Sequence, residues 1–262
     1  MEPTLRQLFS LEGKVALVTG GAGVLGSAMC RALAQAGARV AVASRNLDHC
    51  QHLAEALGPA HFAVAIDLAS EASVRAGIDQ VVAHAGRLDV LVNNGYRGPT
   101  PRQDEATAVE FDYSLTVGVT GQFVAAQQAA RHMRANGGGS IINVASMYGL
   151  VASYPEVYEG LEYTSPPNYH AVKGALIQLT RHLAAYWARD GIRVNCLSPG
   201  AFPHAPLRQQ SPEFIRRLEE RVPLKRVGEP HELMGAVVFL ASEASSYCTG
   251  HNLVVDGGWT IW

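Results

Sequence analysis

Cysteine is scarce in this chain of 262 residues, and its four copies are scattered at Cys30, Cys50, Cys196 and Cys248. None belongs to a C-x-x-C pair, and no histidine accompanies one at the spacing of metal ligands. This absence argues against a disulfide framework and against a metal site. We therefore expect buried free thiols in a reducing compartment, the cytosol.

Long apolar runs and dense blocks of one charge are also missing. The N-terminal segment MEPTLRQLFSLEGK lacks the apolar centre of a signal peptide, and no run of about 20 apolar residues could span a membrane. The 21 basic and 23 acidic residues are interspersed and give a net charge of -2, which argues against nucleic acid as a partner. We expect a cytoplasmic protein that acts on a small-molecule substrate.

No linker rich in proline, glycine and serine divides the chain, so we expect a single domain over residues 1–262. Short apolar or β-branched runs alternate with helical stretches throughout. Because strands in this order pair in parallel through helical crossovers, the pattern predicts an α/β fold. We expect a Rossmann-like, doubly wound, mostly parallel seven-stranded sheet with helices on both faces. The predicted strands are 14–19, 39–44, 61–66, 89–94, 140–145, 193–198 and 252–258.

A glycine-rich turn from Thr19 to Gly26 follows the first predicted strand and opens a predicted helix. Glycines in this context let the backbone bend and approach a diphosphate whose charge lies at the helix N-terminus. The turn therefore indicates dinucleotide binding, although the same composition also suits a plain strand-to-helix connection.

The end of the second predicted strand bears on the choice of cofactor. An acidic residue there would bind the adenosine ribose of NAD, but the chain has Ser44 and Arg45. An arginine beside a hydroxyl suits a 2′-phosphate, so NADP(H) is favoured and NAD(H) is the alternative. Arg45 could equally be a solvated residue at a helix start.

Tyr169 and Lys173 stand four residues apart in a predicted helix, and so share one face of it. A nearby ammonium favours the phenolate and lowers a pKa that is ordinarily near 10, which would make Tyr169 an acid/base group at neutral pH. Tyrosine and lysine at this spacing also occur by chance in amphipathic helices.

Further motifs follow in a fixed order: Asp67-Leu68, Asn93-Asn94, Ser146, Pro199-Gly200 and Asp256-Gly257-Gly258. With the glycine turn and the Tyr169/Lys173 pair, the chain resembles a compact short-chain dehydrogenase/reductase from about Leu11 to its end. The resemblance implies that Ser146 orients the substrate oxygen, Tyr169 exchanges a proton, and Lys173 holds the nicotinamide ribose and lowers the tyrosine pKa. It implies these cofactor contacts: Gly20, Gly23, Val24, Leu25, Ser44, Arg45, Asp67, Leu68, Asn93, Asn94, Gly95, Tyr169, Lys173, Pro199 and Gly200. Ser146 could instead merely end a strand, Asn93 cap a turn, and Asp-Gly-Gly form a turn.

Departures from the family pattern matter as well. Gly118 stands where an asparagine helps to relay protons, and we expect it to leave room for water or substrate. The glycine spacing resembles the extended branch that includes nucleotide-sugar epimerases and dehydratases, and Gly95-Tyr96 replaces Ala-Gly. A long insert at about 150–168, rich in tyrosine and glutamate, could contact substrate or be an exposed excursion.

The remaining expectations concern substrate and assembly. A segment at about 201–222 matches the family's substrate lid, where His204 and Arg208 could meet a polar group. The candidate substrate residues are Tyr96, Arg97, Tyr158 and His204, and they suit a sugar, sugar acid or polyol. The chain is expected to form a homotetramer or homodimer. Two alternative functions remain: a catalytically impaired cofactor-binding sensor or scaffold, and an enzyme like nucleotide-sugar epimerases or dehydratases.

Overall fold

A computed structural model describes residues 2–262 and places seven strands in one sheet, in the order β3-β2-β1-β4-β5-β6-β7. Every neighbouring pair is parallel. The chain builds outward from β1 to one edge and then from β4 to the other, so the topology reverses between β1 and β4. The predicted fold class is confirmed. The strands are β1 (Val15–Thr19), β2 (Arg39–Ser44), β3 (Phe62–Ala65), β4 (Val90–Asn93), β5 (Gly139–Val144), β6 (Ile192–Pro199) and β7 (Asn252–Val255).

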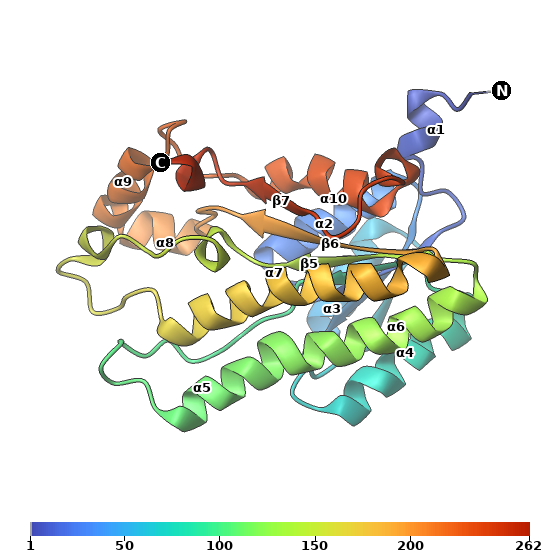
Figure 1. Ribbon diagram of the computed structural model, residues 1–262, viewed down its shortest axis with the longest axis horizontal. Helices are drawn as coiled ribbons and strands as arrows, with labels where there is room; N and C mark the ends of the chain where they lie inside the picture. Colours follow the sequence, from blue (N-terminus) through green and yellow to red (C-terminus); the bar gives the residue numbers. More distant parts are fainter. Residues whose placement is uncertain (1) are drawn as a thin grey trace.

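Helices cover both faces of this sheet (Figure 1). Successive residues of β1 supply opposite faces: Leu17 belongs to the core under one helix layer and Val18 to the core under the other, both with no exposed surface. This is why the central strands are apolar throughout rather than alternating. The first layer holds α4 (Glu71–Ala85), α6 (Gly121–Ala135) and α7 (Pro167–Trp187); the second holds α2 (Val24–Gln35), α3 (Leu47–Leu57) and α10 (Met234–Ala241).

The helical segment that includes residues 111–136 is not one regular α-helix. It begins as α5 (Ala108–Leu115), where Thr107 and Glu110 form a capping box. A π-helical turn, η1 (Thr116–Thr120), then joins α5 to α6 and contains Gly118. Such turns frequently mark functional sites, and this one lies beside α7.

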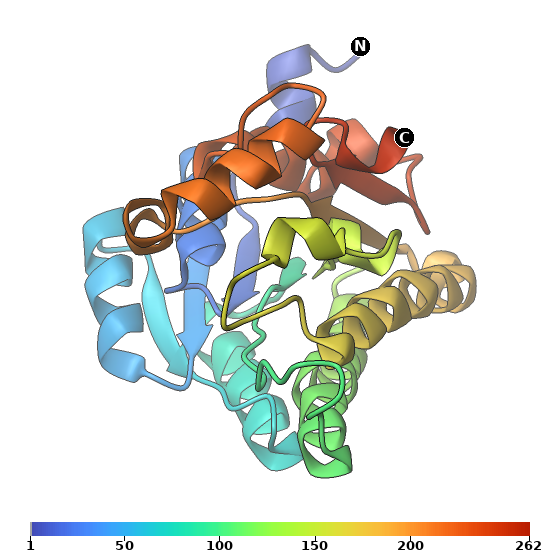
Figure 2. The ribbon, with the colours of Figure 1, turned by 90° about the vertical axis from the view of Figure 1, so that its left-hand side faces the viewer.

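The segments that follow β5 and β6 gather over the carboxyl ends of the strands, the end that faces the viewer in Figure 2. The ring centre of Phe214, in the lid, lies 5.4 Å from that of Tyr158 and 5.7 Å from that of Tyr163. Val157 of the insert is also buried, with 2% of its surface exposed. The 150–168 insert is therefore packed against the lid. The elements here are η2 (Met147–Gly149), η3 (Pro155–Tyr158), α8 (Ala205–Gln210), α9 (Pro212–Arg221) and η7 (Trp259–Ile261).

The opposite end of the sheet carries the N-terminal helix (Figure 1). Three of the four cysteines are buried and all four are free. Within residues 2–262 no group of three or more metal-ligating side chains forms, and no helix has the length and apolarity to cross a bilayer. The remaining short elements are α1 (Leu5–Phe9), η4 (Ala188–Asp190), η5 (Pro230–Leu233) and η6 (Glu243–Ser245).

Candidate active site

A groove follows the carboxyl ends of β1, β2 and β4, at the point where the sheet topology reverses. It consists of two adjoining cavities of about 490 Å³ and 160 Å³. Ligands of doubly wound sheets bind at this position. The structure brings ten of the predicted cofactor residues to its walls: Gly20, Gly23, Val24, Leu25, Ser44, Arg45, Asp67, Leu68, Asn94 and Gly95.

The glycine turn forms one wall of the groove. Gly20 has a φ of +62°, and a Cβ on it would lie 2.7 Å from the Cα of Gly95. A Cβ on Gly26 would collide with the carbonyl of Gly20, so α2 packs directly on the turn. Helix α2 begins after Gly23 without a side-chain cap, which leaves its first N–H groups free for an anion. Gly23 therefore serves as the residue that precedes the helix, even though the glycine spacing of this turn departs from the compact family pattern.

Thr19, Asn93 and Asn94 fix the floor of the groove. The Thr19 hydroxyl accepts from the backbone N–H groups of Asn94 and Gly95, and the Asn94 amide donates to the carbonyls of Thr19 and Gly20. Asn93 is fully buried and donates to Gln122 O and Asn143 Oδ1. Asn93 thus braces the wall from behind, and the sequence offered no sign of the part played by Thr19.

Two arginines line the open side of the groove. Arg45 follows β2 and Arg97 follows β4, and each borders both cavities. Both are exposed, and within residues 2–262 neither guanidinium has a hydrogen bond or ion pair. Arg97, expected on the substrate side, therefore lies with Arg45 in the groove. Tyr113 and Val117 also line it, which no spacing in the sequence indicated.

Ser146, Tyr169 and Lys173 converge beyond the end of β5. Ser146 is 5% exposed, caps η2 and faces the Tyr169 phenol. A Cβ on Gly149 would lie 2.7 Å from the carbonyl oxygen of Lys173, so this glycine lets η2 approach α7 closely. Residues distant in sequence are thereby held as one polar cluster.

The charges in this cluster differ from those expected. Burial raises the pKa of Tyr169, and the Ser146 hydroxyl acts in the opposite direction. Burial lowers the pKa of Lys173 to about 8. The Lys173 ammonium donates to Val144 O at 2.8 Å and lies 5.5 Å from the centre of the Tyr169 ring. The net pKa of Tyr169 is therefore raised rather than lowered, because burial outweighs the groups that favour the phenolate, and the effect of Lys173 on it stays a prediction.

The space at Gly118 is filled. A Cβ there would collide with Val172 Cγ1 and come within 3.0 Å of two ring atoms of Tyr96. The expectation of room for water or substrate was wrong, because the ring of Tyr96 occupies that volume. Tyr96 also borders the groove.

The insert supplies a phenol to the other side of the cluster. Tyr158 shares a 3.0 Å hydrogen bond between hydroxyls with Tyr148, and it lies near enough to Tyr169 to act on its pKa. The ring of Tyr148 stacks on His170 at 4.7 Å. These side chains form an aromatic cluster with hydroxyl groups next to Tyr169.

The lid residues named from the sequence have local roles in the fold. His204 is exposed and caps α8 by accepting from Leu207 N. Arg208 donates to Glu229 and to the carbonyls of Pro203 and Gly228. These bonds use all three guanidinium nitrogens to hold the base of the lid, and a contact of Arg208 with a substrate group stays a prediction.

Pro199 and Gly200 end β6. Gly200 N donates to Val255 O, and neither residue lines the two groove cavities.

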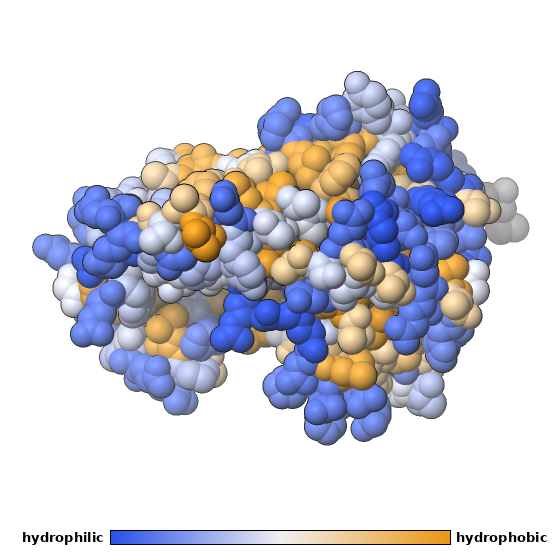
Figure 3. Space-filling model, turned by 90° about the horizontal axis from the view of Figure 1, so that it is seen from below, coloured by the Kyte–Doolittle hydropathy of each residue, from blue (hydrophilic) through white to orange (hydrophobic). Residues whose placement is uncertain are grey.

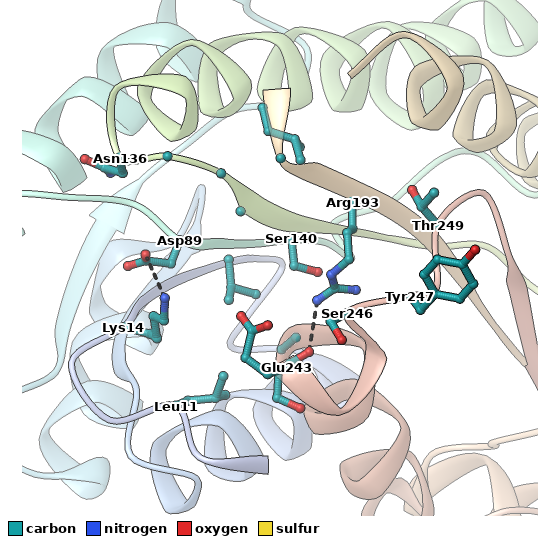
Figure 4. A pocket seen from close by; sticks show the side chains of 18 of the residues that line it. Leu11, Lys14, Asp89, Asn136, Ser140, Arg193, Glu243, Ser246, Tyr247 and Thr249 are labelled. Carbon is teal, nitrogen blue, oxygen red and sulfur yellow. Dashed lines mark hydrogen bonds and ion pairs between the residues drawn. The ribbon is translucent and has the colours of Figure 1, made fainter. Parts of the chain in front are cut away.

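A larger cavity, of about 630 Å³, lies at the amino ends of the strands (Figure 4). Its walls include Lys14, Asp89, Arg193 and Glu243. The Asp89 carboxylate is bound by Val15 N and Arg87, with Lys14 at 3.7 Å. The Arg193 guanidinium donates to the carbonyls of Leu240, Ser242 and Cys248 and to the Ser245 hydroxyl.

Comparison with known proteins gives a consistent result. A family model described as enoyl-(acyl carrier protein) reductase matches residues 20–260. D-threitol dehydrogenase of Mycolicibacterium smegmatis is 36% identical over 97% of this chain and 95% of its own. Galactitol 2-dehydrogenase (L-tagatose-forming) of Cereibacter sphaeroides is 36% identical over 98% and 99%. The crystal structure of a gluconate 5-dehydrogenase from Burkholderia cenocepacia, in complex with NADP and tartrate, is 36% identical and superposes with a TM-score of 0.90 over 99% of this chain and 100% of that one.

Proposed function

The chain belongs to the short-chain dehydrogenase/reductase family, and from this premise we propose that it transfers hydride between NADP(H) and a secondary alcohol or ketone of a sugar, sugar acid or polyol. Its class is that of a nicotinamide-dependent oxidoreductase acting on CH–OH and C=O groups. The observation that carries the proposal is the convergence of Ser146, Tyr169 and Lys173 beside Tyr96, which borders the groove that we propose for the dinucleotide.

The proposed chemistry divides the work between cofactor and side chains. A bound nicotinamide supplies or accepts the hydride. Ser146 donates a hydrogen bond to the substrate oxygen and Tyr169 exchanges the proton on that oxygen, so an alcohol loses one hydride and one proton as it becomes a ketone. Lys173 holds its charge beside the phenol and binds the nicotinamide ribose. The segment of Pro199 and Gly200 would run alongside the nicotinamide.

NADP(H) is proposed over NAD(H) because of the two free guanidinium groups in the groove. Arg45 and the Ser44 hydroxyl lie where β2 ends, and no carboxylate competes there. Arg97 adds a second positive charge on the same wall. A 2′-phosphate gains charge-assisted hydrogen bonds at such a position.

Replacing Arg45 tests this cofactor assignment. Arg45→Asp is expected to lower kcat/KM for NADPH by roughly 10- to 100-fold, because a charge-assisted hydrogen bond contributes about 1.5–3 kcal/mol. The value for NADH should hold or rise. Steady-state kinetics with both cofactors measure the ratio, and an unchanged ratio would exclude Arg45 from 2′-phosphate binding.

The substrate class is supported by the wall opposite the phenol. Tyr158 and Tyr148 carry hydroxyl groups that share a hydrogen bond, and Tyr158 and His204 form the proposed substrate set, whereas Arg97 and Tyr96 border the cofactor groove. Hydroxyl groups arrayed on aromatic rings suit a chain of alcohols better than a steroid-like skeleton. The relatives named for threitol, galactitol and gluconate act on such molecules.

A substrate panel tests the function as a whole. Purified protein is mixed with NADP+ or NAD+ and a series of tetritols, hexitols and aldonic acids, and with NADPH and the matching ketoses; absorbance at 340 nm follows the reaction. We expect turnover with at least one polyol or sugar acid and NADP+. Tight NADPH binding without turnover across the panel would favour the sensor. Tightly bound NAD with no net redox change would favour the epimerase-like enzyme.

Homotetramer or homodimer formation is proposed from the outer surface of the helices. Figure 3 views the molecule from the side of α4, α5 and α6, where apolar patches interrupt the polar surface. Val109 and Tyr113 of α5 are 79% and 40% exposed. Light scattering coupled to size-exclusion chromatography measures the mass, and a monomer at micromolar concentration would contradict the proposal.

A further inference from the structure

The ring of Tyr96 lies behind the Tyr169/Lys173 pair. Its centre is 5.5 Å from that of Tyr169, at an interplanar angle of 58°, and the Lys173 ammonium lies 5.4 Å from it. The same ammonium lies 5.5 Å from the Tyr169 ring, so it is within cation–π distance of both rings. We propose that Tyr96 is a positioning residue whose ring keeps Lys173 charged and in place beside Tyr169, a role that rests on the proposed function.

Two glycines on separate segments make room for this ring. A Cβ on Gly118, in the π-helical turn, would approach the ring edge to 3.0 Å. A Cβ on Gly98, in the loop after β4, would collide with the Tyr96 hydroxyl. A Cβ at Gly98 would therefore displace the Tyr96 hydroxyl, and one at Gly118 would collide with Val172 and push the ring by a few tenths of an ångström. The packing of Tyr96 thus depends on both glycines.

Lys173 needs such a neighbour because few groups compensate its charge. The residue is 3% exposed, and its ammonium donates a hydrogen bond to Val144 O. Four groups face the ammonium: Val144 O from β5, Cys196 from β6, Tyr169 from α7 and Tyr96 from the loop after β4. Burial raises the pKa of Cys196 to about 11, so this thiol carries no charge at neutral pH. The two aromatic faces are therefore the remaining source of negative potential.

The ring, rather than the hydroxyl, carries the effect. The Tyr96 hydroxyl has no hydrogen-bond partner among the described residues. The nearby Ser114 hydroxyl donates to Glu110 O and accepts from Asn168, so it could meet the Tyr96 phenol only as an acceptor through its second lone pair. Phenylalanine at position 96 should therefore preserve the function, whereas an aliphatic side chain should not.

The test compares Tyr96→Leu with Tyr96→Phe by measuring kcat/KM against pH with NADPH. A ring face favours the charged lysine and raises its pKa, so its loss lowers that pKa and the charge disappears at lower pH. We expect the alkaline limb of the Tyr96→Leu profile to move to lower pH by roughly half to one unit, the size of a cation–π contact expressed as a pKa shift. Tyr96→Phe and the exposed control Tyr247→Leu should keep the wild-type limb.

A role in packing alone would lower stability without moving the limb, so an unmoved limb in folded Tyr96→Leu would refute the inference. If Tyr96→Leu does not fold, Tyr96→Met fills the space with a flexible side chain that lacks a ring, and the same shift is expected. The pH dependence of NADPH affinity, followed by fluorescence, gives a second readout. A wild-type protein that neither binds nor turns over a nicotinamide cofactor would defeat the proposed function instead.

Discussion

The cavity at the amino ends of the strands is larger than either part of the groove at the carboxyl ends, yet two of its charged groups, Asp89 and Arg193, are already paired. Asp89 is bound by Val15 N and by Arg87, and Arg193 is held by four acceptors. At the carboxyl ends, Arg45 is free of partners from residues 2–262 and Lys173 is buried with its charge. The difference teaches that free guanidinium groups, rather than cavity volume, distinguish the end of the sheet at which we propose ligand binding.

The largest effect is expected when one phenol hydroxyl is removed at each end of the sheet. Tyr169→Phe is expected to lower kcat by about 10²–10⁴-fold, because the group that exchanges the proton is lost. NADPH affinity should stay nearly constant. Tyr247→Phe, at the rim of the amino-end cavity, should change neither value. Substantial activity in Tyr169→Phe would remove that phenol from the chemistry.

Lys173→Met tests whether the buried charge at the carboxyl ends of the strands lowers the free energy of unfolding. Burial lowers the pKa of Lys173 from 10.5 to about 8, so below pH 8 the folded protein carries an unfavourable buried charge. The shift corresponds to about 3 kcal/mol, reduced by about 1 kcal/mol for the lost hydrogen bond to Val144, so the variant should be more stable at pH 7.

The difference in free energy of unfolding between Lys173→Met and the wild type should narrow as pH rises from 8 to 10.5. In this range the unfolded wild-type protein still binds the Lys173 proton, whereas the folded protein has lost it. Urea unfolding of both proteins between pH 6 and 10 measures this difference. A difference that stays constant over this range contradicts the account.

Gly118→Ala tests the packing behind the catalytic pair. The new methyl would meet Val172 and Tyr96, and overpacking of this kind costs about 1–3 kcal/mol. Gly235 in α10 offers a matched control, since a Cβ there meets nothing within 4 Å. Gly235→Ala should stabilise the protein by up to about 1 kcal/mol through helix propensity. Equal effects of the two changes on urea unfolding would show that position 118 is not constrained.

Asp89→Asn gives the smallest expected effect and completes the comparison. Removing the charge weakens the bonds to Arg87 and Val15 N, and we expect a loss of about 1–2 kcal/mol because the partners are partly exposed. Turnover and NADPH affinity should be unchanged. A large loss of activity in a folded variant would place function at the amino end after all.

Most of the fold could be predicted from the sequence because its signals are local. The expected strands lie within two residues of the observed ones at their amino ends, since a buried parallel strand must be a short apolar run bounded by turn residues. The π-helical turn at Thr116–Thr120 could not be predicted. At this turn the fold brings Gly118, Tyr96 and Val172 together from three segments, and no local pattern specifies that meeting.

The same division applies to the site. The sequence by itself determined the doubly wound sheet, the position of the glycine turn and the pairing of Tyr169 with Lys173 on one helix face, because each depends on spacing along the chain. Only the tertiary structure decided that the insert packs on the lid, that Tyr96 fills the place at Gly118, and that burial raises the pKa of Tyr169. Packing and desolvation depend on neighbours in space, and no local pattern specifies which neighbours those will be.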